Sequence, residues 1–191
     1  MILPEDDPVP EDDPVVEDDP VVEERAPASV TRPLVQPDQR SCGAACLVVA
    51  RGLAEPTYGR SLRDPGRWRT EVLRTHAEVT GLRDGGRPGL PWPRALGTPP
   101  WAVARRLGLT TGRRWRTARP DLARVAEVVR TGHPVALFVG SRLLPRHVLL
   151  AVEDGPDGLR VYDPARGTVR PLADALRVGW PRLWCAVLPR S

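Results

Sequence analysis

The sequence predicts an α+β protein, because helix-like patterns come first along the chain and strand-like patterns follow. Residues 42–53, CGAACLVVARGL, form an apolar run that predicts a buried helix, with Ser41 at its N-cap and Gly52 near its end. From residue 134 onward the apolar segments become short, rich in β-branched residues and bounded by turns. Helices that precede a run of strands are typical of a fold in which the helices pack on an antiparallel sheet.

Three further helices are predicted before the strands begin. One covers about residues 68–80. A second, WAVARRLGL at 101–109, follows two prolines, which are favoured at the first turn of a helix. A third, at 122–132, follows Asp121, a residue type that caps helices, and ends at a glycine. Residues 83–98 are so rich in Gly and Pro that we expect an irregular loop there.

The C-terminal part is predicted to contain four strands, at 134–140, 147–153, 159–163 and 182–188. The sequence DGPDG at residues 154–158 predicts a hairpin turn between the second and the third of them. His147 opens the strand before this turn and Asp163 closes the strand after it. If the two strands pair, His147 and Asp163 lie close together at one end of the hairpin.

Charge is divided unevenly along the chain. The 191 residues carry a formal net charge of +4, but the first 24 residues contain 11 acidic side chains and no basic one. Residues 5–22 repeat EDDPVP, EDDPVV and EDDPVV, and both the prolines and the like charges oppose regular structure. We therefore expect residues 1–28 to be a disordered acidic tail and residues 29–191 to be one folded domain with a charge near +15.

Several classes of protein are disfavoured by composition. No apolar run approaches the roughly 18 to 20 residues of a membrane span, and the acidic N-terminus is the reverse of a secretory signal. Three cysteines do not indicate a disulfide framework. These observations predict a cytoplasmic protein with no membrane segment.

Cys42 is the residue that points most directly to chemistry. It stands at the first turn of the predicted helix, where the helix dipole favours the nucleophilic thiolate. A cysteine nucleophile also needs a base and a group that orients the base, and His147 and Asp163 can supply them. Gln36, six residues before Cys42, can donate its side-chain amide to an oxyanion together with the Cys42 backbone N–H, and Gln39 is the alternative donor.

The other thiols and one more histidine are predicted to have structural roles. Cys46, one turn further along the same helix, and Cys185, in a late strand, are expected in the core. His76 has polar neighbours in its predicted helix and is expected at the surface. A zinc site built from Cys42, Cys46 and Cys185 lacks a recognised ligand spacing, so we expect no metal and no cofactor.

Arginine supplies all 28 basic residues, and its distribution bears on the partners of the protein. The cluster RRWR at 113–116 is the densest, but elsewhere arginine is spread over predicted helices and loops alike. Nucleic-acid binding normally requires basic residues gathered on one face, so no nucleic-acid partner is expected. A basic rim that attracts acidic peptides to the site remains a second use of these side chains.

Gln36, the block CGAACL at 42–47, His147 and Asp163-Pro164 together resemble a papain-like family of cysteine peptidases, over about residues 30–170. This is cysteine peptidase family thirty-nine, the double-glycine leader peptidases of bacteriocin exporters and their stand-alone bacterial relatives. The resemblance implies a papain-like α+β fold and a hydrolase that cuts a peptide bond, with Cys42, His147, Asp163 and Gln36 as its catalytic residues. It also implies a peptide or protein substrate and an exporter or precursor peptide as partner.

The chain departs from that family in two ways and leaves other functions open. It contains neither a transmembrane region nor a nucleotide-binding domain, which suggests a stand-alone form, and the loop at 83–98 could reshape the substrate cleft. The same fold could serve as a non-enzymatic peptide-binding module. The same triad could also serve a cysteine acyltransferase or amidase.

Overall fold

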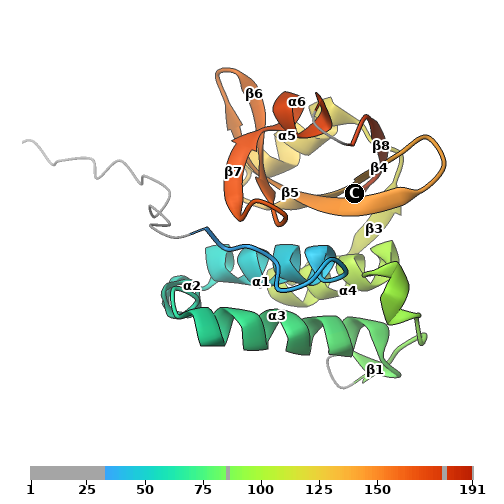
Figure 1. Ribbon diagram of the computed structural model, residues 1–191. Coiled ribbons are helices and arrows are strands. Elements are labelled where there is room, and N and C mark those ends of the chain that lie inside the picture. Colours follow the sequence, from blue (N-terminus) through green and yellow to red (C-terminus); the bar gives the residue numbers. More distant parts are fainter. Residues whose placement is uncertain (1–32, 85–86, 178–179, 191) are drawn as a thin grey trace, which may run out of the picture.

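The computed structural model describes residues 33–84, 87–177 and 180–190, and it shows a layer of helices packed against a sheet (Figure 1). The helical layer consists of α1 (Cys42–Ala54), α2 (Pro56–Ser61), α3 (Pro65–Thr80) and α4 (Pro100–Thr111). The α+β class and the packing of N-terminal helices on a C-terminal antiparallel sheet are therefore confirmed. The predicted acidic tail at 1–28 lies outside the described residues.

The sheet has six antiparallel strands in the order β3-β8-β4-β5-β6-β7. Their bounds are β3 (Trp115–Ala118), β4 (Val135–Gly140), β5 (Pro145–Gly155), β6 (Gly158–Asp163), β7 (Thr168–Pro171) and β8 (Arg182–Pro189). Helix α1 packs against β5 from the helical layer, whereas α5 (Leu122–Arg130) and α6 (Leu172–Arg177) pack on the sheet from the other side (Figure 1). All four predicted strands and the hairpin turn before Gly158 are present.

Both faces of the central strand β4 are covered, which explains its sequence. All six residues of VALFVG are buried, so the strand shows a continuous apolar run without the alternation of a half-exposed strand. On the facing helix, Ala44, Ala45 and Cys46 have no exposed surface. These small side chains allow α1 to lie close to the sheet.

The start of α1 is built differently from the prediction. Ser41 occupies the N-cap position, but its side chain accepts no hydrogen bond from the helix. Asp38 orders the approach to the helix instead, because its Oδ1 accepts hydrogen bonds from the backbone N–H groups of Arg40 (2.8 Å) and Ser41 (2.9 Å). At the other end, α1 continues past Gly52 to Ala54 and stops before a proline, which cannot extend a helix.

The remaining helices follow ordinary start signals. Helix α3 begins at Pro65, earlier than predicted, because the Asp64 side chain accepts the N–H of Arg67 at 2.6 Å and caps it. Helix α5 is capped as predicted by Asp121, which accepts the N–H of Arg124 at 3.1 Å. Helix α4 covers its predicted range and extends to Thr111, with Gly112 as its C-cap, whose φ of 68° suits the left-handed conformation.

Two predictions about the helical layer are wrong in part. The segment at 83–98 is not wholly irregular, since it contains the short strands β1 (Arg83–Asp84) and β2 (Arg87–Pro88) and the turn η1 (Arg94–Leu96). His76 is not at the surface, because only 6% of it is exposed. Its sequence neighbours are polar, but η1 packs against α3 and covers this face of the helix. Among the described residues, no helix is long and apolar enough to cross a membrane.

Candidate active site

Cys42 is the first residue of α1, so its thiol lies at the end of the helix where the backbone N–H groups point outward. Only 5% of the residue is exposed. The side chain is therefore held in a defined place by α1 and by the Asp38 turn that precedes it. This is the position that the sequence predicts.

His147 and Asp163 meet on the sheet, as the hairpin predicts. Strands β5 and β6 pair on either side of the turn, and Nε2 of His147 lies 2.8 Å from Oδ1 of Asp163. Both residues are buried, with 5% and 2% of their surfaces exposed. Oδ1 of Asp163 also accepts the backbone N–H of Ala165 at 3.1 Å, which fixes the carboxylate toward the ring. Because Nε2 faces Asp163, Nδ1 is the ring nitrogen left for a reacting group.

The thiol of Cys42 and the ring of His147 are electrostatic neighbours across the two layers. Burial by itself would lower the pKa of His147, but the hydrogen bond with Asp163 and the influence of the neighbouring Cys42 outweigh burial and raise this pKa to about 9. The imidazole is therefore protonated around neutral pH. A protonated ring beside Cys42 is the partner that a thiolate requires.

Asp163 stays ionised in spite of its burial. Burial acts to raise the pKa of this carboxyl, but the hydrogen bond with His147 and the charges of His147 and Arg170 together lower it below its usual value. Nε of Arg170 lies 3.4 Å from Oδ2 of Asp163, and only 16% of the arginine side chain is exposed. Arg170 thus offsets the charge of the carboxylate at Oδ2, whereas His147 contacts Oδ1.

Trp180 covers the imidazole of His147. The two rings are stacked, with centroids 5.3 Å apart and an angle of 19° between their planes. An aromatic ring in this position keeps water away from the ion pair, which strengthens the attraction between His147 and Asp163.

Gln36 is held beside the Asp163 turn. Its backbone N–H donates to the carbonyl of Pro164 at 2.8 Å, and its Nε2 donates to the carbonyl of Asp38 at 2.7 Å. One of the two amide hydrogens on Nε2 is thereby used and the other is left. Oε1 of Gln36 is buried and has no hydrogen-bond partner among the described residues. Gln39, the alternative donor, is exposed to solvent.

The loop after η1 forms a wall beside the first turn of α1. A Cβ on Gly43 would lie only 2.6 Å from Cβ of Thr98, so glycine is needed for this close approach. Thr98 is buried, with 4% of its surface exposed, and its hydroxyl has no partner among the described residues. The Gly/Pro-rich segment therefore reaches the residue next to Cys42.

The other two cysteines do not join this group. Cys46 is fully buried, as predicted, and its thiol lies 3.5 Å from the carbonyl of Val148. Burial raises the pKa of Cys46 well above its usual range, and it raises that of the half-buried Cys185 to about 11. Within the described ranges, no group of three or more His, Cys, Asp and Glu is arranged to hold a metal ion.

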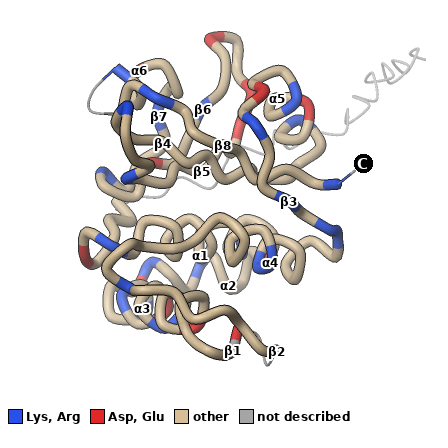
Figure 2. The backbone as a smooth tube through the Cα atoms, turned by 90° about the vertical axis from the view of Figure 1, so that its right-hand side faces the viewer, with Lys and Arg blue, Asp and Glu red and all other residues tan. Residues whose placement is uncertain are grey.

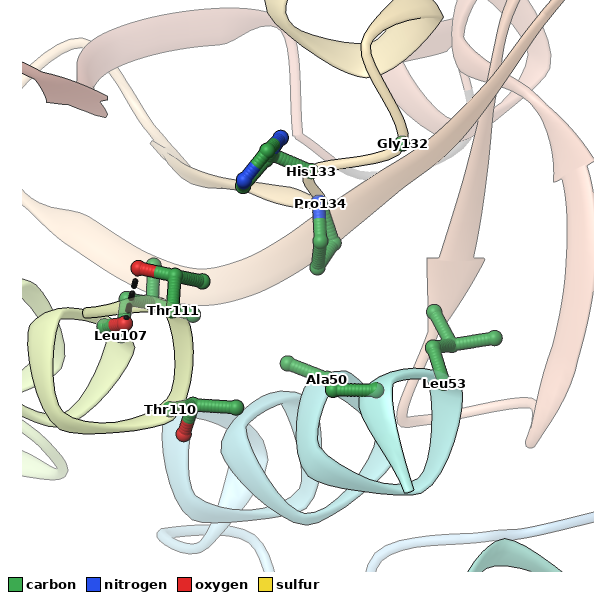
Figure 3. Close-up of a pocket in the computed structure, with 9 residues that line it drawn as sticks. Ala50, Leu53, Leu107, Thr110, Thr111, Gly132, His133 and Pro134 are labelled. Carbon is green, nitrogen blue, oxygen red and sulfur yellow. Dashed lines mark hydrogen bonds between the residues drawn. The ribbon is translucent and has the colours of Figure 1, made fainter. Parts of the chain in front are cut away.

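A cavity of about 220 Å³ lies at the other end of α1 (Figure 3). Its helical side combines apolar residues, among them Ala50, Leu53 and Leu107, with two threonines of α4, and Pro134 projects from the sheet side. Ala50 is eight residues beyond Cys42, which corresponds to roughly 12 Å along the helix axis. The cavity is therefore separate from the group formed by Cys42, His147 and Asp163.

Three residues of the site were not identified from the sequence. Arg170 could have been found from the hairpin of β6 and β7, because Thr168 pairs with Asp163 and residues two apart on a strand share a face. Trp180 and Thr98 carry no such signal, since both lie in irregular backbone. Trp180 is far along the chain from His147, and Thr98 is far from Gly43.

No family model and no curated protein matches this chain. The assignment of a function therefore depends on the residues and geometry described above.

Proposed function

We propose that the protein hydrolyses a peptide bond with a Cys42–His147–Asp163 triad, assisted by Gln36. The observation that carries the proposal is the arrangement around His147. One nitrogen of this buried ring is bound to Asp163 at 2.8 Å, and its raised pKa reflects contact with Cys42 at the N-terminus of α1. Nucleophile, base and orienting group are thus in the order that thiol hydrolysis requires.

The reaction would run in two halves. The Cys42 thiolate attacks the carbonyl carbon, and the resulting oxyanion is stabilised by the Cys42 backbone N–H and the remaining amide hydrogen of Gln36. Protonated His147 then gives its proton to the leaving amine, the C–N bond breaks, and an acyl-thioester remains on Cys42. Neutral His147 next takes a proton from water, and the resulting hydroxide attacks the thioester. The C–S bond then breaks, which releases the acid product and regenerates the Cys42 thiolate.

We further propose that the fold is papain-like and that the protein is related to the double-glycine leader peptidases. The supporting features are a nucleophile at the start of a buried helix, a histidine and an aspartate on neighbouring antiparallel strands, and a glutamine six residues before the cysteine. Processing of a leader peptide in the cytoplasm is the finer form of this proposal.

Selective modification of Cys42 tests the nucleophile. The full chain is incubated with a limiting amount of a peptide-based electrophile, and the labelled cysteine is identified by mass spectrometry. Cys46 and Cys185 serve as internal controls, because both are less acidic than an ordinary thiol. We expect Cys42 to label first, and equal or faster labelling of either control would overturn the assignment.

Turnover of a peptide library separates hydrolysis from binding alone. We expect the unmodified chain to cut a subset of peptides and Cys42→Ala to cut none. Binding by both proteins without turnover would identify a peptide-binding module. Transfer of the acyl group to an added amine at the expense of hydrolysis would identify an acyltransferase.

A further inference from the structure

We propose that the site selects peptides rich in aspartate and glutamate. This inference names the substrate class of the site and rests in that sense on the proposed function. It is carried by a separate observation, which is the occurrence of exposed arginines without ion pairs in the segments that carry the triad.

Exposed arginines stand within three residues of every member of the triad: Arg40 before Cys42, Arg146 before His147 and Arg166 after Asp163. These three side chains come from three separate segments of the fold. None of them forms an ion pair with a carboxylate among the described residues. Their charges are therefore left to interact with a ligand.

Further arginines extend this surface on both layers. The β4–β5 turn carries Arg142, and Arg182 on β8 donates to the Arg142 carbonyl at 3.3 Å. The Arg182 guanidinium lies 4.7 Å from the ring centre of Trp184, which holds it in place. On the helical layer, exposed Arg94 belongs to η1, close to Arg40. We call the following residues the site arginines: Arg40, Arg94, Arg142, Arg146, Arg166 and Arg182.

Carboxylates near the site are few, because most acidic residues of the folded part are engaged elsewhere. Eight of them form ion pairs with other arginines: Glu55, Glu71, Glu78, Asp84, Glu127, Glu153, Asp154 and Asp174. Close to the triad, Asp38 binds backbone N–H groups and Asp163 binds His147. Figure 2 shows that arginine positions occur on both the helices and the sheet.

This environment favours one chemical class of ligand. Guanidinium groups bind carboxylates through paired hydrogen bonds, and several unpaired cations around one site raise the local concentration of acidic peptides. Leu143 and Leu96 lie one and two residues after Arg142 and Arg94 in the sequence, with 83% and 66% of their surfaces exposed. Apolar residues between the acidic ones would find partners there.

Two sources of such a peptide can be distinguished. One is the chain's own N-terminal segment, whose first 24 residues contain 11 acids and no base in EDDPVV-type repeats. The other is a separate acidic peptide. Both present the same carboxylates to the same arginines, so one set of measurements can test the chemistry and a second can identify the source.

Binding is measured with the full chain carrying Cys42→Ala, so that cleavage does not interfere. The probes are a fluorescein-labelled peptide EDDPVVEDDPVV and its neutral counterpart QNNPVVQNNPVV. We expect the acidic peptide to bind at least about tenfold more tightly at about 0.05 M salt, and the difference to shrink toward about 0.5 M salt. Equal affinities for the two peptides at low salt would overturn the inference.

Matched arginine variants locate the binding surface. The triple variant Arg40→Gln, Arg146→Gln, Arg166→Gln should lose most of the preference for the acidic peptide. The control triple variant Arg60→Gln, Arg63→Gln, Arg69→Gln removes the same charge at the α2 end of α1, away from Cys42 (Figure 1), and should retain the preference. A loss of equal size in both variants would show general charge attraction and would overturn the inference.

A further variant of the full chain replaces every Asp and Glu at residues 5–24 by Asn and Gln. If the N-terminal segment is the natural ligand, this variant binds the acidic probe more tightly than the parent chain. If a separate peptide is the ligand, both bind it equally.

Turnover separates this inference from the proposed function. Cleavage of acidic and neutral peptides at equal rates would leave hydrolysis standing and overturn the acidic preference. Arginine-dependent binding of the acidic peptide without any cleavage would support the acidic preference and overturn the proposed hydrolysis.

Discussion

His147 sets the pH range in which the triad can work. Burial would lower its pKa, but Asp163 and the neighbouring Cys42 raise it to about 9, and in the proposed reaction the protonated ring supplies the proton to the leaving amine. We therefore expect kcat/KM for peptide cleavage to fall above about pH 9. Alkylation of Cys42 needs no proton donor, so its rate should not fall there. A decline of both rates together would contradict the role given to His147.

The same shift makes a prediction about stability. Because the pKa of His147 is higher in the folded protein than the ordinary value of 6.5, protonation of this ring stabilises the fold. The contribution is complete below about pH 6.5 and is lost as the pH rises through about 9. Urea denaturation of the parent chain should show a decline in the free energy of unfolding over this range. In His147→Gln the decline should be smaller, and an equal decline would count against the buried ion pair.

Arg170, which contacts Asp163, is expected to affect the pH dependence of peptide cleavage. Its guanidinium lies 3.4 Å from the carboxylate, so it stabilises the ionised acid but opposes the positive charge on His147. Removal of this charge in Arg170→Gln should raise the pKa of His147. The alkaline fall of kcat/KM should then move to higher pH, whereas Arg170→Lys should keep it near its original position. No shift in Arg170→Gln would show that the arginine has only a structural role.

At the scale of elements, the contact between α1 and the loop after η1 depends on the absence of a side chain at Gly43. In Gly43→Ala the new Cβ would lie 2.6 Å from Cβ of Thr98. We expect an overpacking cost of about 1–3 kcal/mol, partly offset by about 1 kcal/mol from the better helix propensity of alanine. Labelling of Cys42 should slow because the first turn of α1 must shift.

Two variants check this explanation. The double variant Gly43→Ala, Thr98→Gly removes the clash and should recover the labelling rate. Gly66→Ala in the first turn of α3 is the matched control, since its methyl group would approach only the Asp64 side chain, at 3.3 Å. Slow labelling in the double variant would contradict the steric explanation.

The elements with strong local signals were predictable, and those that depend on packing were not. Helix α1 has a long apolar run and β4 has a short, continuous apolar one, so each specifies its own structure. The short elements α2, β3, β7 and α6 have four to six residues each and gain their stability from neighbours. Strand β3, WRTA, lies at the sheet edge and contains an arginine and a threonine among its four residues, so it shows no clear hydrophobic pattern.

The candidate site was predictable to the extent that its groups follow local rules. A cysteine at a helix start and a His–Asp pair across one hairpin could be placed from sequence, and the structure brings both about. The burial of His76 and the stacking of Trp180 on His147 could not be predicted from the sequence, because both arise from segments that meet only in the folded chain.

At the scale of the whole molecule, the two layers are joined across the core by contacts such as that of the Cys46 thiol with the Val148 carbonyl. Because Cys46 has no exposed surface, we expect its modification only when the helical layer leaves the sheet. In a urea series, its labelling rate should follow global unfolding, whereas Cys42 should label in the native state. Labelling of Cys46 as fast as Cys185 without urea would show that the layers separate locally.

Leu34 and Gln36 donate their backbone N–H groups to Gly167 and Pro164, about 130 residues later in the chain. This early segment, the helix start at Cys42 and the hairpin with His147 and Asp163 can therefore meet only after most of the domain has been made. During synthesis at about 5–20 residues per second, the thiol would exist for several seconds without its base. The proposed triad is thus completed only late in synthesis, and a peptidase built this way would not cut its neighbours while its chain is still incomplete.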